Sequence, residues 1–324
     1  MSTRSNPGFA VIALALGLLI IGTPASAKGR SEATTEDESR AYIEQTRIAA
    51  PKRVGEFVLG KTEYDPETKS SGAFLRYDIP DRPDLHIDLF IYPAGDLPHD
   101  DAVKAGMKDF RASLDAAAKA GYYDDLRVLD TTDFEIPPPP AATDEVATPS
   151  DASGSTSPPD RNAARDPEIE TMLAALAPKP IVGRRMDLRY RMPIGAQGEP
   201  VPMYSRGYLF HRQLYYFKGR ISAPESQIDR TTFESLTDRA MRTLVPAVVA
   251  SNIGGCSQVS ITLDRKSIDK DASIADLLLQ MIGGSDMGIE RHCFETREEA
   301  MEEEPKDATI VVIDYDPSDW GGTP

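Results

Sequence analysis

Two neighbouring segments of alternating residues constrain the fold of this chain more than any other feature of its sequence. In residues 73–79 and 85–92, apolar side chains occupy every second position, as in β-strands with one buried face. The Pro-Asp-Arg-Pro-Asp sequence between them predicts a turn. If Ile79 pairs with Leu85, a single register places the apolar side chains on one face, so an antiparallel hairpin is expected.

The same register matches the polar residues of the two strands. Asp78 then faces His86, Arg76 faces Asp88, and Phe74 faces Phe90. One interpretation is a functional charged patch with a histidine that titrates near neutral pH. The interpretation we favour is structural, because such cross-strand pairs contribute about 0.2–1 kcal/mol each to a hairpin.

Two longer segments have helical periodicity. Apolar residues recur at three- and four-residue spacing through 100–120, and Gly121 is a suitable C-terminal stop. A second apolar stripe runs through 231–248, where Thr231 and Glu234 have the spacing of a capping box. Pro246 is expected to strain or end the last turn of that helix.

The remaining segments complete the predicted order of elements. Extended segments are expected at 54–64, 125–136, 186–192, 204–210, 214–221, 259–263 and 309–315, and short helices at 39–48, 169–176 and 273–282.

These elements predict an α+β protein, with an antiparallel sheet packed by two long amphipathic helices and a small disulfide-tied C-terminal α/β piece. This order of elements resembles the Mog1/PsbP-like α+β sandwich in topology. The α+β domain is expected to span 39–250, and a C-terminal subdomain with an acidic tail 251–324. A Pro-, Ala- and Ser-rich stretch at 137–166 is predicted to be a flexible linker that interrupts the domain.

The N-terminus has the organisation of a secretory signal peptide, predicted to span residues 1–27. Arg4 is followed by an apolar run at 9–22 and by the small residues Ala25-Ser26-Ala27. The run would span about 21 Å as a helix, which is less than the roughly 30 Å of a bilayer core. We therefore expect an exported, soluble protein in the periplasm or outside the cell, with a disordered stretch at 28–38. If the leader were retained, it would act as a short anchor instead.

The chain has two cysteines, Cys256 and Cys293. An even number in an exported chain favours a disulfide bond, which would stabilise the fold by roughly 3.5–4 kcal/mol in the chain-entropy model. The alternative is a Cys293 nucleophile assisted by His292. Adjacent side chains on a strand point to opposite faces, so that pair is poorly placed for catalysis.

The charge is distributed unevenly along the chain. The formal net charge is −16, which disfavours binding to nucleic acid. Residues 181–220 nevertheless contain eight Lys or Arg residues against two acidic ones. Arginine beside aromatic residues suits phosphates, carboxylates or an acidic partner, and the candidate ligand-binding residues are Arg189, Arg191, Arg212 and Lys218. The alternative is internal neutralisation by acidic runs such as 298–299 and 302–304.

The sequence shows no catalytic, metal or cofactor motif. The four histidines lack the spacing of a zinc site, and nucleophile-elbow, P-loop and dinucleotide-binding patterns are missing. The expected function is therefore non-catalytic binding of an envelope protein or an anionic envelope ligand, without a cofactor. The alternatives are a secreted or periplasmic hydrolase with a non-local carboxylate site, and a structural component held in a complex through the linker.

Overall fold

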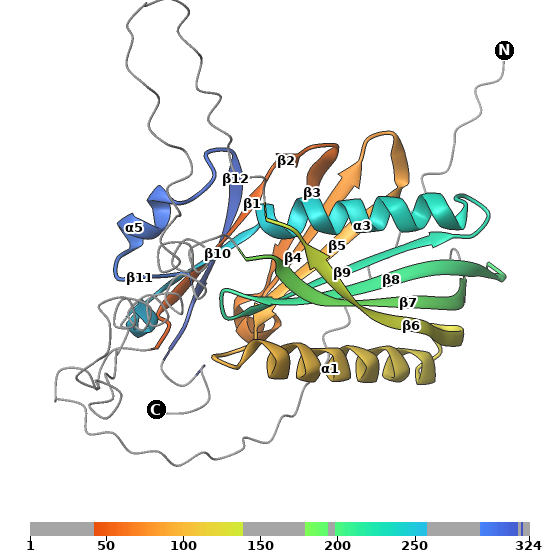
Figure 1. Ribbon diagram of the computed structural model, residues 1–324, viewed down its shortest axis with the longest axis horizontal. Helices are drawn as coiled ribbons and strands as arrows, with labels where there is room; N and C mark the ends of the chain where they lie inside the picture. The colour runs from red at the N-terminus through yellow and green to blue at the C-terminus, as the bar shows by residue number, and fades with distance from the viewer. Residues whose placement is uncertain (1–41, 139–178, 194–197, 258–291, 317–318, 320–324) are drawn as a thin grey trace, which may run out of the picture.

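The computed structural model describes residues 42–138, 179–193, 198–257, 292–316 and 319. They form an α+β protein with an eight-stranded antiparallel sheet, two longer helices and a smaller mixed sheet (Figure 1). The predicted leader, the stretch 28–38, residues 139–166 of the linker and the elements expected at 169–176, 259–263 and 273–282 lie outside the described residues. Within the described residues, no helix has the length and apolar character of a membrane span.

The larger sheet has the strand order β2-β3-β4-β5-β9-β8-β7-β6, and all its neighbouring strands are antiparallel. Its strands are β2 (Arg53–Val54), β3 (Phe57–Tyr64), β4 (Ala73–Ile79), β5 (Arg82–Pro93), β6 (Asp124–Ile136), β7 (Ile181–Pro193), β8 (Pro200–Arg212) and β9 (Tyr215–Pro224). The pairing of β5 with β9 joins the two parts of the sheet, which come from widely separated parts of the chain.

The smaller sheet has the order β11-β10-β1-β12. Its strands are β1 (Gln45–Pro51), β10 (Val249–Ile253), β11 (Cys293–Phe294) and β12 (Ala308–Asp314). The short helical segments of the protein are η2 (Pro66–Ser71), η3 (Gly255–Ser257) and α5 (Arg297–Glu302). The strand predicted near the C-terminus is confirmed by β12. The C-terminal segment does not build this sheet alone, because β1 comes from the other end of the described chain and pairs with both β10 and β12.

The predicted hairpin is confirmed by β4 and β5, including its register. Arg76 pairs with Asp88, Asp78 with His86, and Phe74 with Phe90. The turn differs from the prediction, because the register shifts after Asp78 and Ile79 pairs with Arg82 instead of Leu85.

The two long helices are α1 (His99–Lys119) and α3 (Arg230–Ala247), close to the predicted bounds. Gly121 follows α1 with φ of 82°, a left-handed conformation in which glycine is favoured. The predicted cap of α3 is wrong: the N-cap is Asp229, whose side chain accepts a hydrogen bond from the Thr232 backbone N–H. Asp229 supplies the side-chain oxygen that the first turn of a helix needs.

The helix expected at 39–48 is also wrong, because residues from Gln45 onward form β1. The side chains of Ile48, Ala49 and Ala50 are fully buried. Pairing with β10 and β12 decides the conformation of this segment, and both partners are more than 190 residues away in the sequence.

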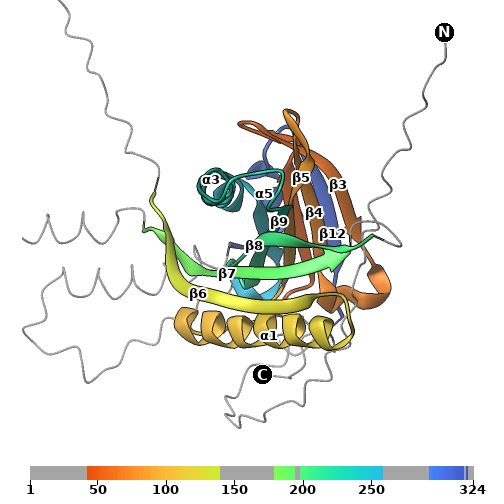
Figure 2. The same ribbon diagram turned by 90° about the vertical axis from the view of Figure 1, so that its right-hand side faces the viewer.

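The two long helices pack on opposite faces of the larger sheet. Figure 2 shows the sheet curled around α3, with α1 along its outer side. The larger apolar core lies on the inner face and includes residues of α3 and of the smaller sheet. A second, smaller core lies between α1 and strands β7, β8 and β9 on the outer face. Side chains that alternate along one strand therefore enter two different environments.

Buried hydroxyl groups connect the two sheets. The Tyr215 hydroxyl donates to Thr46 Oγ1 at 2.8 Å and lies 2.6 Å from the Tyr315 hydroxyl. Thr46 in turn donates to Asn252 Oδ1 at 2.8 Å. Because buried polar groups are costly unless they are hydrogen-bonded, this network fixes the smaller sheet against β9.

Candidate functional site

The four predicted ligand-binding cations do not form one surface. Arg189, Arg191 and Arg212 lie on the inner face of the larger sheet, which α3 covers, whereas Lys218 lies on the outer face beside α1. The sequence places them close together, but strand alternation separates them. The structure therefore divides the proposed basic face into two sets of residues.

On the inner face, Arg189 is committed to a carboxylate within the protein. It makes two hydrogen bonds to Glu225, with N···O distances of 2.6 and 2.8 Å. These bonds raise the pKa of Arg189 above its usual value. Arg191 donates to the backbone oxygen of Pro200 at 2.6 Å. Both guanidinium groups thus have partners in the strands and turns next to them.

Arg212 has a structural environment at the end of α3. Its guanidinium donates to the backbone oxygen of Val245 and lies 5.3 Å from the centre of the Phe217 ring. Burial lowers the pKa of Arg212 to about 10. A cation at the C-terminal end of a helix satisfies a free carbonyl and interacts favourably with the helix dipole.

The sequence interpretation missed Arg206, which is the most enclosed cation of the inner face, with 4% of its side chain exposed. It donates to Asp187 at 2.5 Å, to Asp238 at 3.0 Å and to the Glu234 backbone oxygen at 2.9 Å. Tyr208 also donates to Asp238, at 2.6 Å. This cluster ties α3 to β7 and β8, and only the register of these elements could have revealed it.

Most of the inner-face arginines are therefore neutralised by carboxylates of the protein itself, but these carboxylates are not the ones expected from the sequence. Asp187, Glu225 and Asp238 provide the carboxylates. Of the acidic runs, Glu304 instead pairs with Arg47 of β1.

On the outer face, Lys218 of β9 is enclosed by three aromatic rings. Its ammonium lies 4.9 Å from the centre of the Phe90 ring, 5.2 Å from Phe110 and 5.5 Å from Tyr92. No carboxylate of the described residues lies within ion-pair distance of it. Burial lowers the pKa of Lys218 to about 8, and the like charge of Arg220 contributes to the shift.

Arg220 lies two residues further along β9, on the same face. Its guanidinium lies over the Tyr123 ring, 5.0 Å from the ring centre. Burial opposes the charge of Arg220, but interactions with Tyr190 and Tyr123 raise its pKa overall. Asp88 is its cross-strand neighbour, but both Asp88 oxygens accept hydrogen bonds from Arg76, at 2.7 and 2.9 Å. We call Lys218, Arg220 and the rings of Phe90, Tyr92, Phe110 and Tyr123 the β9 strip.

The charged patch predicted on the hairpin borders the β9 strip. His86 Nδ1 lies 2.7 Å from Asp78, and Arg76 is paired with Asp88. The two pairs are those expected from the sequence. Their geometry agrees with a structural role, because each charged group is satisfied by its cross-strand partner.

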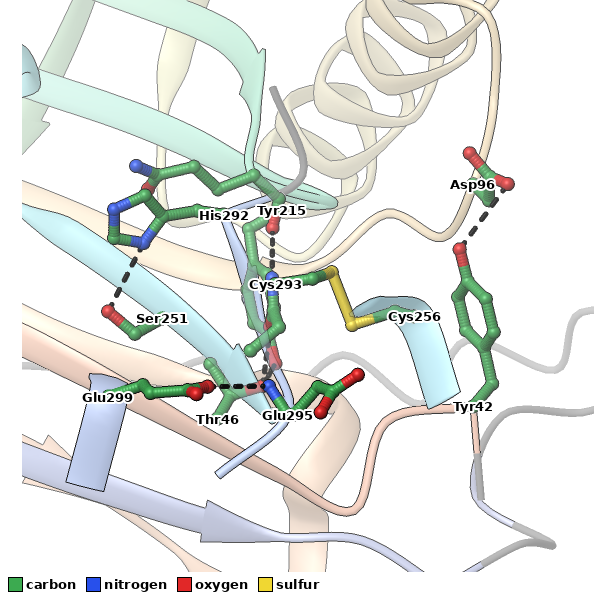
Figure 3. The surroundings of a disulfide bond; sticks show 12 residues. Tyr42, Thr46, Asp96, Tyr215, Ser251, Cys256, His292, Cys293, Glu295 and Glu299 are labelled. Atoms are coloured by element: carbon green, nitrogen blue, oxygen red, sulfur yellow. Dashed lines mark hydrogen bonds between the residues drawn. A yellow bond between two sulfur atoms is a disulfide. The ribbon is translucent and has the colours of Figure 1, made fainter. Parts of the chain in front are cut away.

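The predicted disulfide bond joins Cys256 and Cys293 (Figure 3). With its sulfur in this bond, Cys293 is not a free thiol nucleophile. His292 instead places Nδ1 3.2 Å from the Ser251 hydroxyl. Ser251 is fully buried, so this pair offers a substrate no approach to the hydroxyl.

Neither a metal cluster nor a family relationship helps to define the site. In the described parts of the chain, no group of three or more His, Cys, Asp or Glu residues is arranged to hold a metal ion. No protein-family model matches the chain, and no curated protein or solved structure matches it. The fold and the β9 strip therefore define the class of this protein as an α+β protein with a cation–aromatic surface. The function has to be inferred from the residues of the β9 strip.

Proposed function

We propose that the protein acts outside the cytoplasm as a non-catalytic binding protein, and that the β9 strip receives an anionic group of its ligand. The single observation that carries this proposal is the Lys218 ammonium, which is enclosed by rings and has a like charge instead of a carboxylate as its charged neighbour. Taking a cation out of water without a counter-ion is costly. An incoming anion would remove that cost.

The contrast with the other face supports this assignment. In a chain of net charge −16, carboxylates are abundant. On the inner face, Arg189 pairs with Glu225, and Arg206 pairs with Asp187 and Asp238. Of the four residues first assigned to ligand binding, Lys218 keeps that role in the proposal. A site with a single ammonium group suits a small anionic envelope ligand better than it suits the extended surface of a protein partner.

The location and the finer fold class belong to the same proposal. The leader at 1–27 supports export to the periplasm or the medium, and a disulfide bond suits an oxidising compartment. The alternation of sheet and helices supports a Mog1/PsbP-like topology.

The hydrolase alternative gains no support from the shifted carboxylates. Hydrogen bonding to Thr232 lowers the pKa of Asp229, and bonds to Arg230 and Lys69 lower those of Glu234 and Asp319. A general acid requires the opposite shift.

A direct test is an NMR titration of the purified full chain with acetate, phosphate and sulfate. We expect shifts centred on the backbone amides of β9, and their loss in Lys218→Met. The matched control is Lys104→Met, which removes an exposed lysine of α1. Anion binding that is the same in both variants, or that is lost only in the Arg189→Ala/Arg191→Ala double variant, would refute the assignment to β9.

A further inference from the structure

The surface next to Lys218 has an aromatic character that an inorganic anion would not use. Phe90 and Phe74 follow Lys218 in one cross-strand row over β9, β5 and β4. Their ring centres are 5.1 Å apart, and the ring planes are inclined by 47°. Both side chains are partly exposed, so the row continues from a cation onto an accessible apolar surface.

The outer face of the sheet is covered unevenly. Helix α1 packs against β6, β7 and β8, and its Phe110 ring reaches Lys218 at the margin of that cover. Strands β4 and β5 continue beyond the helix in Figure 2. The row Lys218–Phe90–Phe74 thus begins at the helix margin and extends over the adjoining strands.

The dimensions of the row fit a small two-part ligand. Neighbouring strands lie about 4.8 Å apart, so the row from Lys218 to Phe74 spans roughly 10 Å. That is the scale of a two-ring aromatic carboxylate. Lys218 offers a single point charge, whereas the Arg220 guanidinium lies over the Tyr123 ring. One ammonium suits a monoanion better than a polyanion.

We infer that the ligand class of this site is a small aromatic carboxylate, with its carboxylate at Lys218 and its ring system over Phe90 and Phe74. This inference rests on the proposed function and adds the apolar half of the ligand. Arg76, whose guanidinium lies 5.4 Å from the centre of the Phe74 ring, borders the far end of the row. The negative charge of the whole chain opposes polyanions such as nucleic acid.

Three probes separate the contributions of charge and ring. Acetate carries the negative charge without rings. Naphthylmethanol carries the rings without the charge, and naphthoate carries both. Titration of the purified full chain, followed by NMR, should show naphthoate binding about tenfold more tightly than either of the others, as expected when an aromatic contact adds to an ionic one. The shifted amides should include those of β4 and β5.

Two conservative variants test the two ends of the row separately. Lys218→Met should make naphthoate bind no better than naphthylmethanol, and Lys104→Met should leave the preference intact. Phe74→Leu keeps an apolar side chain and should weaken naphthoate about threefold or more while leaving acetate unchanged. Thermal unfolding of each variant confirms that it is folded, and Phe90→Leu provides a second test should Phe74→Leu be unstable.

The outcomes distinguish the two proposals. Acetate binding that depends on Lys218, together with naphthoate that binds no more tightly than acetate, would overturn the aromatic ligand class and leave anion binding in place. If neither anion depends on Lys218, the proposed function itself fails, and the aromatic ligand class fails with it.

Discussion

Two cations on opposite faces of the larger sheet, Arg206 and Lys218, have opposite surroundings. On the inner face, Arg206 is buried among carboxylates of β7 and α3. On the outer face, Lys218 and Arg220 lie against aromatic rings. The first arrangement satisfies a charge within the fold, whereas the second leaves the charge of Lys218 without a counter-ion among the described residues.

This difference shows how a basic segment should be interpreted when it forms strands. The excess of cations in residues 181–220 suggests one basic surface, but a side-chain period of two distributes the cations over both faces. Lys218, which has no carboxylate partner among the described residues, keeps a charge that an external anion can use. The following predictions test that contrast, from the largest expected effect to the smallest.

Replacing Arg206 by Met should have the largest effect on stability. The change leaves Arg185 as the cation of the partly buried Asp187 and Asp238, at the longer distances of 3.4 and 3.3 Å. Removing one partner of a buried ion pair costs up to about 3–5 kcal/mol. Urea unfolding followed by circular dichroism measures the loss in free energy of unfolding. A loss no larger than that of the exposed Arg189→Met variant would show that the inner-face cluster is not a buried ion-pair network.

Replacing Lys218 by Met should abolish a pH dependence. In the folded protein the pKa of Lys218 is lowered from 10.5 to about 8, so the unfolded chain binds the proton more tightly between these values. Stability of the wild type therefore rises from about pH 8 to about pH 10.5, by at most about 3 kcal/mol from this residue.

The measurement is the difference in free energy of unfolding between wild type and Lys218→Met at several pH values. The titration of Arg212, whose pKa is lowered to about 10, is common to both proteins and cancels in the difference. At pH 7 the Met variant should be at least as stable as the wild type, because an apolar side chain replaces an uncompensated cation. A pH-independent difference would contradict the aromatic enclosure of a charged Lys218.

Replacing Arg189 by Met should have the smallest effect. Its side chain is 54% exposed, and exposed ion pairs contribute little to stability. We expect unfolding curves that overlap with those of the wild type and unchanged titrations with naphthoate. A marked loss of anion binding would move the site to the inner face and reverse the comparison between the two faces.

Local sequence patterns predicted the hairpin well. Alternation between residues 73 and 92 gave the correct pairing of Arg76 with Asp88 and of Asp78 with His86, because a shift of one residue would move every apolar side chain to the other face. The bulge near Ile79 was not predictable in this way, since it depends on how the turn closes. The two long helices were equally clear from their apolar spacing.

The failures occurred where distant partners decide the structure. The local sequence from Gln45 to Ile48 is compatible with a helix. These residues instead form a central strand, because they pair with β10 and β12. The candidate site shows the same limitation: Lys218 was selected as one of four similar cations, and nothing local distinguishes it from Arg212. Its ring partners Phe90 and Phe110 come from β5 and α1, more than 100 residues earlier in the chain.

The sequence by itself determined the helical and strand periods, the hairpin register, the leader-like N-terminus and the pairing of Cys256 with Cys293. These properties depend on spacing within a short window or, for the cysteines, on the absence of any other candidate. Only the tertiary structure decided which cations meet carboxylates and which meet rings. That outcome depends on long-range strand order, which places Asp187 beside Arg206 and Phe90 beside Lys218, and no local pattern encodes such contacts.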